Sequence, residues 1–291
     1  MTTVIPSPTV GVLHLGPFPL RGYALCILAG IVLAVWLTDR RLQAQGVEAG
    51  KALDVSAWAV VFGIIGGRVY HVITTPAPYW GEGGHPVDAL KIWEGGLGIW
   101  GAVALGALGA WIGCRRHGVS FGQFTDAVVP GLAFAQGIGR VGNWFNNELY
   151  GGPTDLPWGL TIHEWDQAAG RAVLDASGQP IVLGTFHPTF LYELVFDVAL
   201  GFFLLWAGRR FRLGRGQLTG LYIAGYPIGR ILIEKMRTDS AELILGQRLN
   251  VWTSIVVFLL GVWIFRHNAT RDEDSAPSAS SDDEPPRRAP D

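Results

Sequence analysis

Long apolar stretches alternate with short polar segments along the whole chain. Seven of these stretches approach the roughly 20 residues that a helix needs to cross the hydrocarbon core of a membrane. The clearest is the last one, because the run from Val251 to Phe265 contains no charged side chain. The pattern predicts an all-α integral membrane protein with about seven transmembrane helices, at residues 22–39, 55–74, 97–114, 121–140, 188–208, 217–234 and 250–266.

Three of the predicted helices are less apolar than the others because each carries a charged residue. Arg68 belongs to the second helix, Asp126 to the fourth and Arg230 to the sixth. A charge at the centre of a bilayer costs ~3 kcal/mol or more, so intramembrane charges normally face a protein interior, a polar ligand or water. These three helices are the ones from which a functional site is expected.

Arginines in the short loops predict the orientation of the chain, because such residues are retained on the cytoplasmic side. They occur at alternate helix ends, so all of them lie on one side. The N-terminus is therefore expected outside and the C-terminus inside, with segments 75–96, 141–187 and 235–249 outside. The arginines that carry this prediction are Arg40, Arg41, Arg115, Arg116, Arg209, Arg210, Arg212, Arg215 and Arg266.

Residues 1–266 are predicted to form a single seven-helix domain, followed by a tail at 267–291. The tail is rich in Ser, Pro and acidic residues, which predicts disorder in the cytoplasm. The longest outer loop, 152–186, alternates Val-Leu with Pro-Gly pairs, which predicts short strands or turns in a small external cap. The first seventeen residues lack a basic region and an A-x-A-like site, so no cleaved signal peptide is expected.

Composition excludes several classes of protein. Hydrophobic residues make up 49% of the chain and charged residues only 16%, which is unlike an ordinary soluble enzyme. The net charge of −2 gives no support to a nucleic-acid partner. The histidines show no ligand spacing, and neither a metal nor another cofactor is expected. Cys26 and Cys114 are predicted near opposite membrane faces and too far apart to pair, as small apolar packing residues.

The candidate chemistry lies near the outer ends of the helices, where Arg68, Arg140 and Arg230 come from three different spans. A single arginine at that depth can extend its guanidinium to the lipid headgroups. Three on separate helices favour a binding site instead. Because a guanidinium binds two phosphate oxygens at once and stays charged, the pattern indicates a phosphate ligand, and a phospholipid headgroup is the phosphate available at that depth.

Acidic residues and glycines complement these arginines. Glu234 and Arg237 follow Arg230 on one helical face. Asp126 and Asp197 are expected to neutralise Arg68, Arg140 or Arg230, and Glu148 and Glu193 to orient the site. The glycines of "GGRVY", "EGGLGIWGA" and "GIGRVGN" are expected to permit close helix packing or contact with a lipid glycerol backbone.

Several segments together resemble one known family. "GIGRVGNWFNNELYG" at 137–151 is similar to the signature of the bacterial prolipoprotein diacylglyceryl transferases (phosphatidylglycerol:prolipoprotein diacylglyceryl transferases). "RGYALCILAG" resembles the first helix of that family, "GGRVYHV" its second, "HPTFLYE" its His-Pro-x-x-Leu-Tyr-Glu, and "GYPIGRILIEKMRTD" its second essential-arginine segment. The matches run in the family's order from about residue 20 to 240.

The resemblance implies a membrane enzyme of the bacterial cytoplasmic (inner) membrane, with its catalytic domain at 1–266 and its active site toward the outer face. It implies transfer of the diacylglyceryl group of phosphatidylglycerol to the thiol of the lipobox cysteine in a preprolipoprotein signal peptide, with release of glycerol phosphate. The alternative left open is a transporter or channel for a phosphate-bearing or anionic substrate; a receptor or scaffold would need no clustered arginines.

The resemblance also implies roles for individual residues. Arg140 and Arg230 would hold the phosphate and, with Tyr23 and Glu148, form the catalytic set. The residues implied to bind substrate are Arg140, Asn143, Asn146, Gly151, Arg68, His187, Tyr192, Glu193, Tyr226, Glu234 and Arg237.

The chemistry agrees with these residue types. Fixed guanidiniums stabilise a phosphate leaving group, and they favour the thiolate form of an attacking cysteine.

Two positions depart from the family pattern. Many members carry a histidine near the start of the third helix, where this chain has Trp100, and arginine often stands where this chain has Gly152. That histidine cannot be the general base here. His187, Tyr23, Tyr226, Glu148 and water remain as alternatives.

Overall fold

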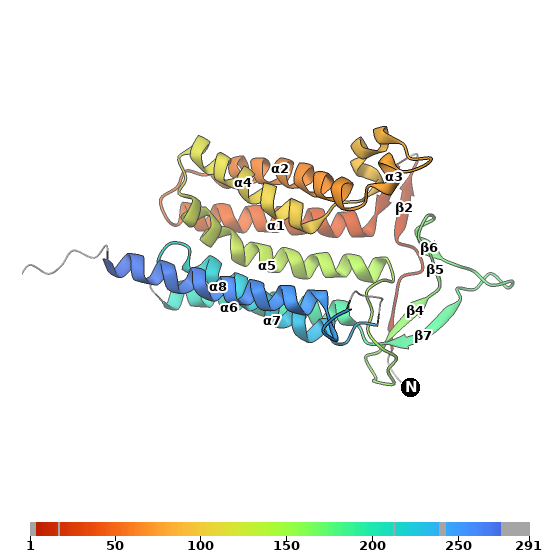
Figure 1. The fold of residues 1–291 in the computed structure, drawn as a ribbon. Coiled ribbons are helices and arrows are strands. Elements are labelled where there is room, and N and C mark those ends of the chain that lie inside the picture. Colours follow the sequence, from red (N-terminus) through yellow and green to blue (C-terminus); the bar gives the residue numbers. More distant parts are fainter. Residues whose placement is uncertain (1–3, 17, 212, 239–242, 275–291) are drawn as a thin grey trace, which may run out of the picture.

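The computed structural model describes residues 4–16, 18–211, 213–238 and 243–274. Seven long helices dominate it, and each overlaps one of the seven predicted ranges (Figure 1). Their bounds are α1 Gly22–Gln43, α2 Lys51–Thr74, α4 Ile99–His117, α5 Phe121–Phe145, α6 Thr189–Arg210, α7 Gln217–Glu234 and α8 Leu249–Asp274. The prediction of a mainly helical protein with helices at these places is therefore confirmed.

Four of these helices are long and apolar enough to cross a membrane: α1, α2, α6 and the part of α8 from Leu249 to Ala269. The sequence singled out three helices as less apolar. Two of them, α5 and α7, are not among these four, but the third, α2, is. The remaining long helix, α4, is also not among the four. The end of α4 is the reason, since Arg115, Arg116 and His117 occupy its last turn.

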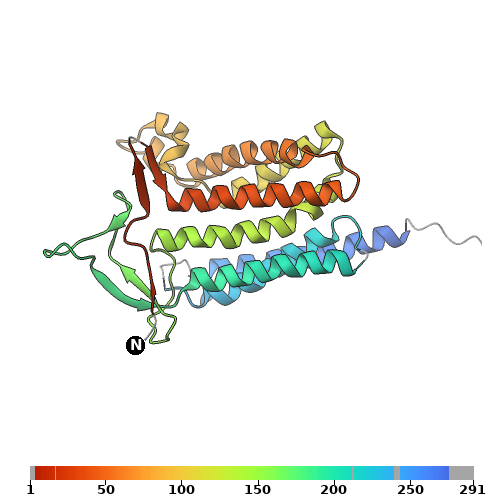
Figure 2. The ribbon, with the colours of Figure 1, turned by 180° about the vertical axis from the view of Figure 1, so that it is seen from behind.

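The bundle is organised around α5. This helix packs against α1 on one side and against α6 and α7 on the other, while α2 pairs with α4 and α7 with α8. Figures 1 and 2 show α5 between these two groups of helices. A helix at the centre of a bundle must bury most of its length, and α5 buries nine residues along it, among them Ala127, Ala133 and Asn143.

Close helix contacts depend on glycine, as the sequence predicted. A Cβ atom on Gly66 of α2 would overlap the carbonyl oxygen of Gly101 of α4, and one on Gly131 of α5 would lie 2.9 Å from the Cα of Ala34 of α1. Any side chain at these positions would push the helices apart. Cys26 and Cys114, on α1 and α4, are free thiols.

Short β-strands qualify the all-α prediction. The loop 152–186 forms strands as expected, and β4 (Leu160–His163) pairs antiparallel with β7 (Val182–Phe186). On the other edge of β4 lies β1 (Ile5–Pro6), parallel to it. β5 (Trp165–Asp166) pairs with β6 (Arg171–Ala172). The N-terminal lead-in contains a hairpin, β2 (Val12–Leu15) with β3 (Phe18–Arg21), that the sequence did not predict.

Three further short helices and one hairpin complete the described elements. The short helices lie between α2 and α4: α3 (Ala77–Trp80) and the 3-10 turns η1 (Pro86–Leu90) and η2 (Ile92–Glu94). The hairpin of β8 (Leu243–Ile244) and β9 (Gln247–Arg248) leads into α8.

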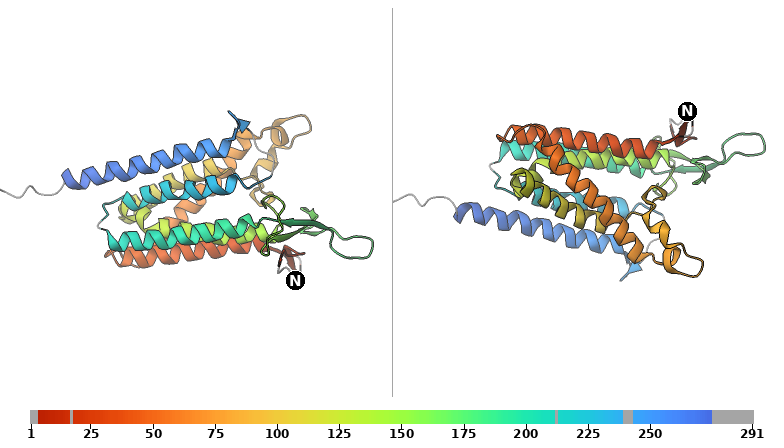
Figure 3. Two further views of the ribbon diagram at one scale, coloured as in Figure 1. Left: turned by 90° about the horizontal axis from the view of Figure 1, so that it is seen from below. Right: turned by 90° about the horizontal axis from the view of Figure 1, so that it is seen from above.

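These elements and the strands lie at one end of the bundle, whereas the arginine-rich ends of α1, α4, α6 and α8 lie at the other (Figure 3). α8 continues through residues 267–274, which the sequence assigned to the tail. Residues 275–291 of the predicted tail, and Arg212, lie outside the described residues.

Candidate active site

Glu193 joins two arginines that come from different helices. Its Oε2 lies 2.5 Å from Nε of Arg140 on α5, and its Oε1 lies 3.4 Å from Nη1 of Arg230 on α7. Glu193 itself begins the second turn of α6. All three side chains are mostly buried, with 10% to 19% of their surface exposed. One carboxylate thus holds two guanidiniums next to each other at the sheet-bearing end of the bundle.

Two more polar groups contact or face this arginine pair. Nη2 of Arg140 donates a hydrogen bond to the hydroxyl of Tyr226 at 3.3 Å, which places Tyr226 directly in the site. Asp197 is buried one turn along α6 from Glu193 and interacts electrostatically with Arg140 and Arg230. Among the described residues, its Oδ2 has no hydrogen-bond partner. Asp197 therefore lies near the arginines, and in the part of the chain that the structure describes no hydrogen bond or ion pair joins it to them.

Glu234 extends the network toward α8. It is completely buried, and its Oε2 lies 2.9 Å from Nη2 of Arg230. Its Oε1 lies 2.8 Å from Nε of Arg248 and accepts a hydrogen bond from Asn250 at 2.9 Å. Arg237 lies at its edge, 3.9 Å away. Glu234 consequently fixes one side of Arg230 while Glu193 contacts the other.

The asparagines of the 137–152 segment form a second cluster around Glu148. Nδ2 of Asn143 and Nδ2 of Asn146 both donate to Oε1 of Glu148, at 3.0 and 3.1 Å. Asn143 is buried and lies one turn from Arg140 on α5, which ends two residues later. A carboxylate held by two amides is therefore a fixed acceptor at the end of the helix that carries Arg140.

Asn147 has a different role from its neighbours. It takes a positive φ of 50°, which asparagine tolerates better than most residues. Its side chain accepts hydrogen bonds from Ser7 at 2.6 Å and from the backbone of His163 at 3.2 Å, and it donates to Pro8 at 2.8 Å. Asn147 thus ties the end of α5 to the segment that follows β1 and to β4.

Tyr23, Gly151, His187 and Tyr192 border these clusters. A Cβ atom on Gly142 would lie 2.6 Å from the ring of Tyr23, so the tyrosine packs against α5 between Arg140 and Asn143. The backbone N–H of Gly151 donates to the carbonyl of His187, whose own N–H donates to Gly152, and Gly151 also forms a β-bridge with Arg237. Nδ1 of His187 lies 3.2 Å from the Tyr192 hydroxyl. These contacts bring the segments after α5, before α6 and after α7 together.

Arg68 lies apart from the arginine pair. Its guanidinium donates to the carbonyls of Ala89 at 2.8 Å, Gly95 at 2.6 Å and Gly96 at 3.1 Å, and also to that of Asp88. It stacks over the ring of Tyr79 at 5.3 Å. Within the described part of the chain, no contact joins Arg68 to Arg140 or Arg230. Arg68 holds the connection between α2 and α4 in place.

The expectation that Asp126 neutralises one of the three arginines is wrong. Asp126 accepts hydrogen bonds from the backbone of Gly216 at 2.6 Å, and from the backbone and hydroxyl of Thr219 at 2.8 and 2.7 Å. These donors form the first turn of α7, whose free N–H groups attract a carboxylate. The pairing of Asp126 is therefore at the opposite end of the bundle from Glu193.

Two contributors to the site were missed by sequence reasoning. Arg248, at the end of β9, and Asn250, in the first turn of α8, bind Glu234 and lie beyond the quoted segments that resemble the family. Their only signal was two polar residues at the beginning of the last apolar stretch of the chain. In the described ranges, no three His, Cys, Asp or Glu side chains come close enough to hold a metal ion.

The fold and the site define a helical membrane protein with a paired arginine cluster suited to an oxyanion. Two guanidiniums on separate helices offer several N–H donors in a fixed arrangement, which matches a phosphate geometrically. The same positive charge stabilises negative charge that develops on a leaving group.

Comparison with known proteins identifies the family. Residues 10–267 match the family model described as prolipoprotein diacylglyceryl transferase, and the chain belongs to this family. It is 56% identical over 255 residues to phosphatidylglycerol–prolipoprotein diacylglyceryl transferase 2 of Streptomyces coelicolor, covering 88% of this chain and 78% of that one. It is 53% identical over 281 residues to the protein of the same name, without the number, from Paenarthrobacter aurescens, covering 96% and 88%. The resemblance inferred from the sequence is confirmed.

Proposed function

We propose that this chain transfers the diacylglyceryl group of phosphatidylglycerol to the lipobox cysteine of preprolipoproteins. Membership of the family makes it a transferase, and its apolar helices suit a lipid bilayer. Its relatives are named for the same lipid and the same class of protein substrate. The observation that carries the proposal to individual residues is the bridge that Glu193 makes between Arg140 and Arg230.

The membrane arrangement is part of the proposal. The seven long helices span the cytoplasmic membrane, with the arginine-rich ends of α1, α4, α6 and α8 in the cytoplasm. The arginine pair and the strands then lie at the outer face, and β4 to β7 form the external cap. The lipid phosphate reaches Arg140 and Arg230 from the outer leaflet, and the peptide thiol arrives from the side of the cap.

In the reaction, the thiolate sulfur attacks the glycerol carbon that bears the phosphate ester. A carbon–sulfur bond forms, the carbon–oxygen bond breaks, and glycerol phosphate leaves with the bonding electrons. Arg140 and Arg230 bind the phosphate and stabilise its growing charge. The thiol proton passes to a base, for which Glu148, His187, Tyr23, Tyr226 and water are the candidates. Glu148 is the one held by two amides, one of them from Asn143, which lies one turn from Arg140 on α5.

The position of the apolar core favours transfer over transport. Between the arginine pair and the opposite end of the bundle, α5, α6 and α7 pack together through Val129, Ala133, Leu200, Leu204 and Leu218. An ion or a polar solute would have to cross this layer. A transport path would instead need polar groups through the whole depth of the membrane.

A mass measurement tests the proposal. Purified protein is incubated with a lipobox peptide and isotopically labelled phosphatidylglycerol, and a labelled diacylglyceryl adduct on the cysteine is expected. Arg140→Ala should abolish the adduct, whereas Arg116→Ala, at an exposed position in the last turn of α4 at the opposite end of the bundle, should not. Absence of any adduct with the unaltered protein would refute the function. Normal transfer by Arg140→Ala and Arg230→Ala would refute only the roles given to these residues.

A further inference from the structure

The C-terminal halves of α6 and α8 carry the same pattern of surface residues. In each helix the pattern begins with a large apolar residue. An aliphatic residue follows three positions later, a tryptophan four positions later, and basic residues seven and eight positions later. These spacings put all five side chains on one helical face. The sets are Phe202, Leu205, Trp206, Arg209 and Arg210 on α6, and Leu259, Val262, Trp263, Arg266 and His267 on α8.

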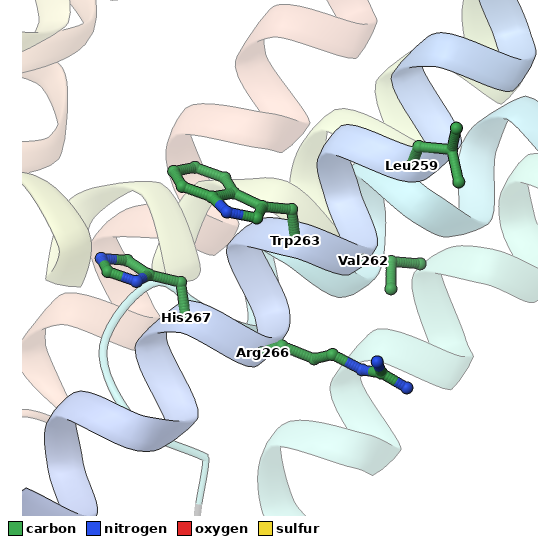
Figure 4. Close-up of a pocket in the computed structure, with 5 residues that line it drawn as sticks. All are labelled: Leu259, Val262, Trp263, Arg266 and His267. Carbon is green, nitrogen blue, oxygen red and sulfur yellow. The ribbon is translucent and has the colours of Figure 1, made fainter.

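Each set lines a surface hollow near the arginine-rich end of the bundle. The hollow on α8 has a volume of about 410 Å³ and that on α6 about 690 Å³. Both hollows are shallow and largely open on their outer side. In Figure 4, Trp263 and His267 project from one side of α8, and Arg266 extends beside Val262 on the other. Leu259, Val262 and Arg266 thus follow one another along one side of the helix, which puts an apolar surface next to a cationic end.

The side chains of the hollows face outward rather than into the bundle. Trp263 is 61% exposed and Trp206 is 53% exposed. The ring of Trp263 stacks on that of His267 with centroids 5.2 Å apart, which holds both rings in place. Both helices are among those long and apolar enough to cross a membrane. The exposed face that surrounds each hollow is therefore a lipid-contacting face.

The same end of two other helices carries a related pair. The guanidinium of Arg40 stacks over Trp36 on α1 at 5.7 Å, and that of Arg115 over Trp111 on α4 at 5.1 Å. In each case the basic residue follows the tryptophan by four positions, as His267 follows Trp263. Four helices thus present a tryptophan and a basic group toward the same end of the bundle, a combination that is typical of a membrane interface.

We propose that the hollows on α6 and α8 each bind an anionic glycerophospholipid of the cytoplasmic leaflet. The acyl chains lie along Phe202 and Leu205, or Leu259 and Val262. The phosphate lies at Arg209 and Arg210, or at Arg266. Apolar surface ending in a guanidinium at the headgroup level complements such a lipid in both polarity and charge. The proposal rests on the orientation given above for its choice of leaflet, and it assigns these lipids no part in the transfer.

Native mass spectrometry tests this proposal with phosphatidylserine as the probe. The full-length protein is exchanged into detergent micelles that contain equal amounts of phosphatidylserine and phosphatidylcholine, and the retained lipids are counted. Preferential retention of phosphatidylserine is expected. Arg209→Gln/Arg210→Gln should remove one retained molecule of phosphatidylserine, and Arg266→Gln should remove another. In the triple variant the ratio of retained phosphatidylserine to phosphatidylcholine should be at least threefold lower. Arg171→Gln, at an exposed position on β6 at the other end of the molecule, is the matched control.

The outcomes separate this site from the catalytic one. The triple variant should retain diacylglyceryl transfer in detergent. Arg209 and Arg210 lie about four turns along α6 from Glu193, and Arg266 lies about four turns along α8 from Asn250, which binds Glu234. Equal retention of both lipids by the unaltered protein, or an equal loss with Arg171→Gln, would overturn the proposal. If the triple variant folds poorly, Trp206→Phe and Trp263→Phe provide a milder test, in which an unchanged preference counts against it. Failure of transfer by the unaltered protein would affect the proposed function and leave this result intact.

Discussion

Nε of Arg140 and Oε2 of Glu193 lie 2.5 Å apart although the two residues are on different helices. Glu193 also contacts Arg230, so one carboxylate positions both guanidiniums of the site. Without it, two like charges on α5 and α7 would face each other in a poorly hydrated interior, where their repulsion is only weakly screened. The spacing of the arginine pair therefore depends on a residue that need not touch the phosphate.

Glu193→Gln is expected to lower the rate of diacylglyceryl transfer by about 10- to 100-fold, because displacement of a binding group by about 1 Å can have an effect of that size. The measurement is the initial rate of adduct formation on a lipobox peptide, with folded protein quantified by size-exclusion chromatography. Glu164→Gln, an exposed position of the same chemistry near the strands, is the control. A rate for Glu193→Gln equal to that of the control would contradict the positioning role.

Arg248→Gln tests the second carboxylate. Glu234 is completely buried and binds both Arg230 and Arg248. Without Arg248, the negative charge of Glu234 acts more strongly on Arg230 and draws it away from the phosphate. We expect KM for phosphatidylglycerol to rise several-fold with little change in kcat. Arg248→Lys, which keeps the charge, should restore part of the affinity. A fall in kcat alone, or an Arg248→Lys variant no better than Arg248→Gln, would show that Arg248 does not act through Arg230.

The sequence predicted the helices well because transmembrane length and apolarity are local properties. It also identified Arg140, Arg230, Glu193 and Glu234, since a charged residue inside an apolar stretch is conspicuous. Its error at Asp126 has a physical cause. Depth along a predicted helix did not reveal that the N–H groups opening α7 would face this carboxylate.

Contacts that join distant segments could not be predicted in the same way. Arg248 meets Glu234 only because the β8–β9 hairpin reverses the chain, and Arg68 meets four carbonyls only because the α2–α4 connection folds over it. The N-terminal strand β1 likewise finds its partner β4 more than 150 residues later. Neither composition nor periodicity encodes such pairings, since each depends on the assembled fold.

Gly66→Ala is expected to destabilise the α2–α4 pair. The added methyl group would overlap the carbonyl oxygen of Gly101, and forcing extra volume into a packed contact costs about 1–3 kcal/mol. The midpoint of thermal unfolding in detergent should fall. Gly63→Ala is a matched control on the same face, because a Cβ atom there would lie 3.5 Å from the nearest atom, an ordinary contact. Equal midpoints for the two variants would contradict the close approach of α2 and α4.

Asp126→Asn should affect folding rather than catalysis. The carboxylate of Asp126 accepts three hydrogen bonds from the start of α7, and a bond to a charged group contributes about 1.5–3 kcal/mol. A lower unfolding midpoint with unchanged transfer per folded molecule is expected. Glu48→Gln, in an exposed ion pair, is the control for loss of a surface charge. A selective loss of transfer with normal stability would contradict this prediction and show that Asp126 contributes to catalysis.

His163 makes the junction between the N-terminal strand and the cap sensitive to acid. Burial lowers the pKa of this histidine, whose Nδ1 lies 3.2 Å from Oγ of Ser7. Because the folded-state pKa is below the unfolded value, the folded form binds fewer protons. The contribution of His163 to the stability of the junction is therefore complete above the unfolded pKa of about 6.5 and is lost as the pH falls through the folded pKa.

Hydrogen exchange of β1 and β4 should accelerate from pH 7 to pH 5 beyond the change in the intrinsic exchange rate. His163→Asn, which has no titrating ring, should remove this extra dependence. If both proteins respond to pH in the same way, another group controls the junction.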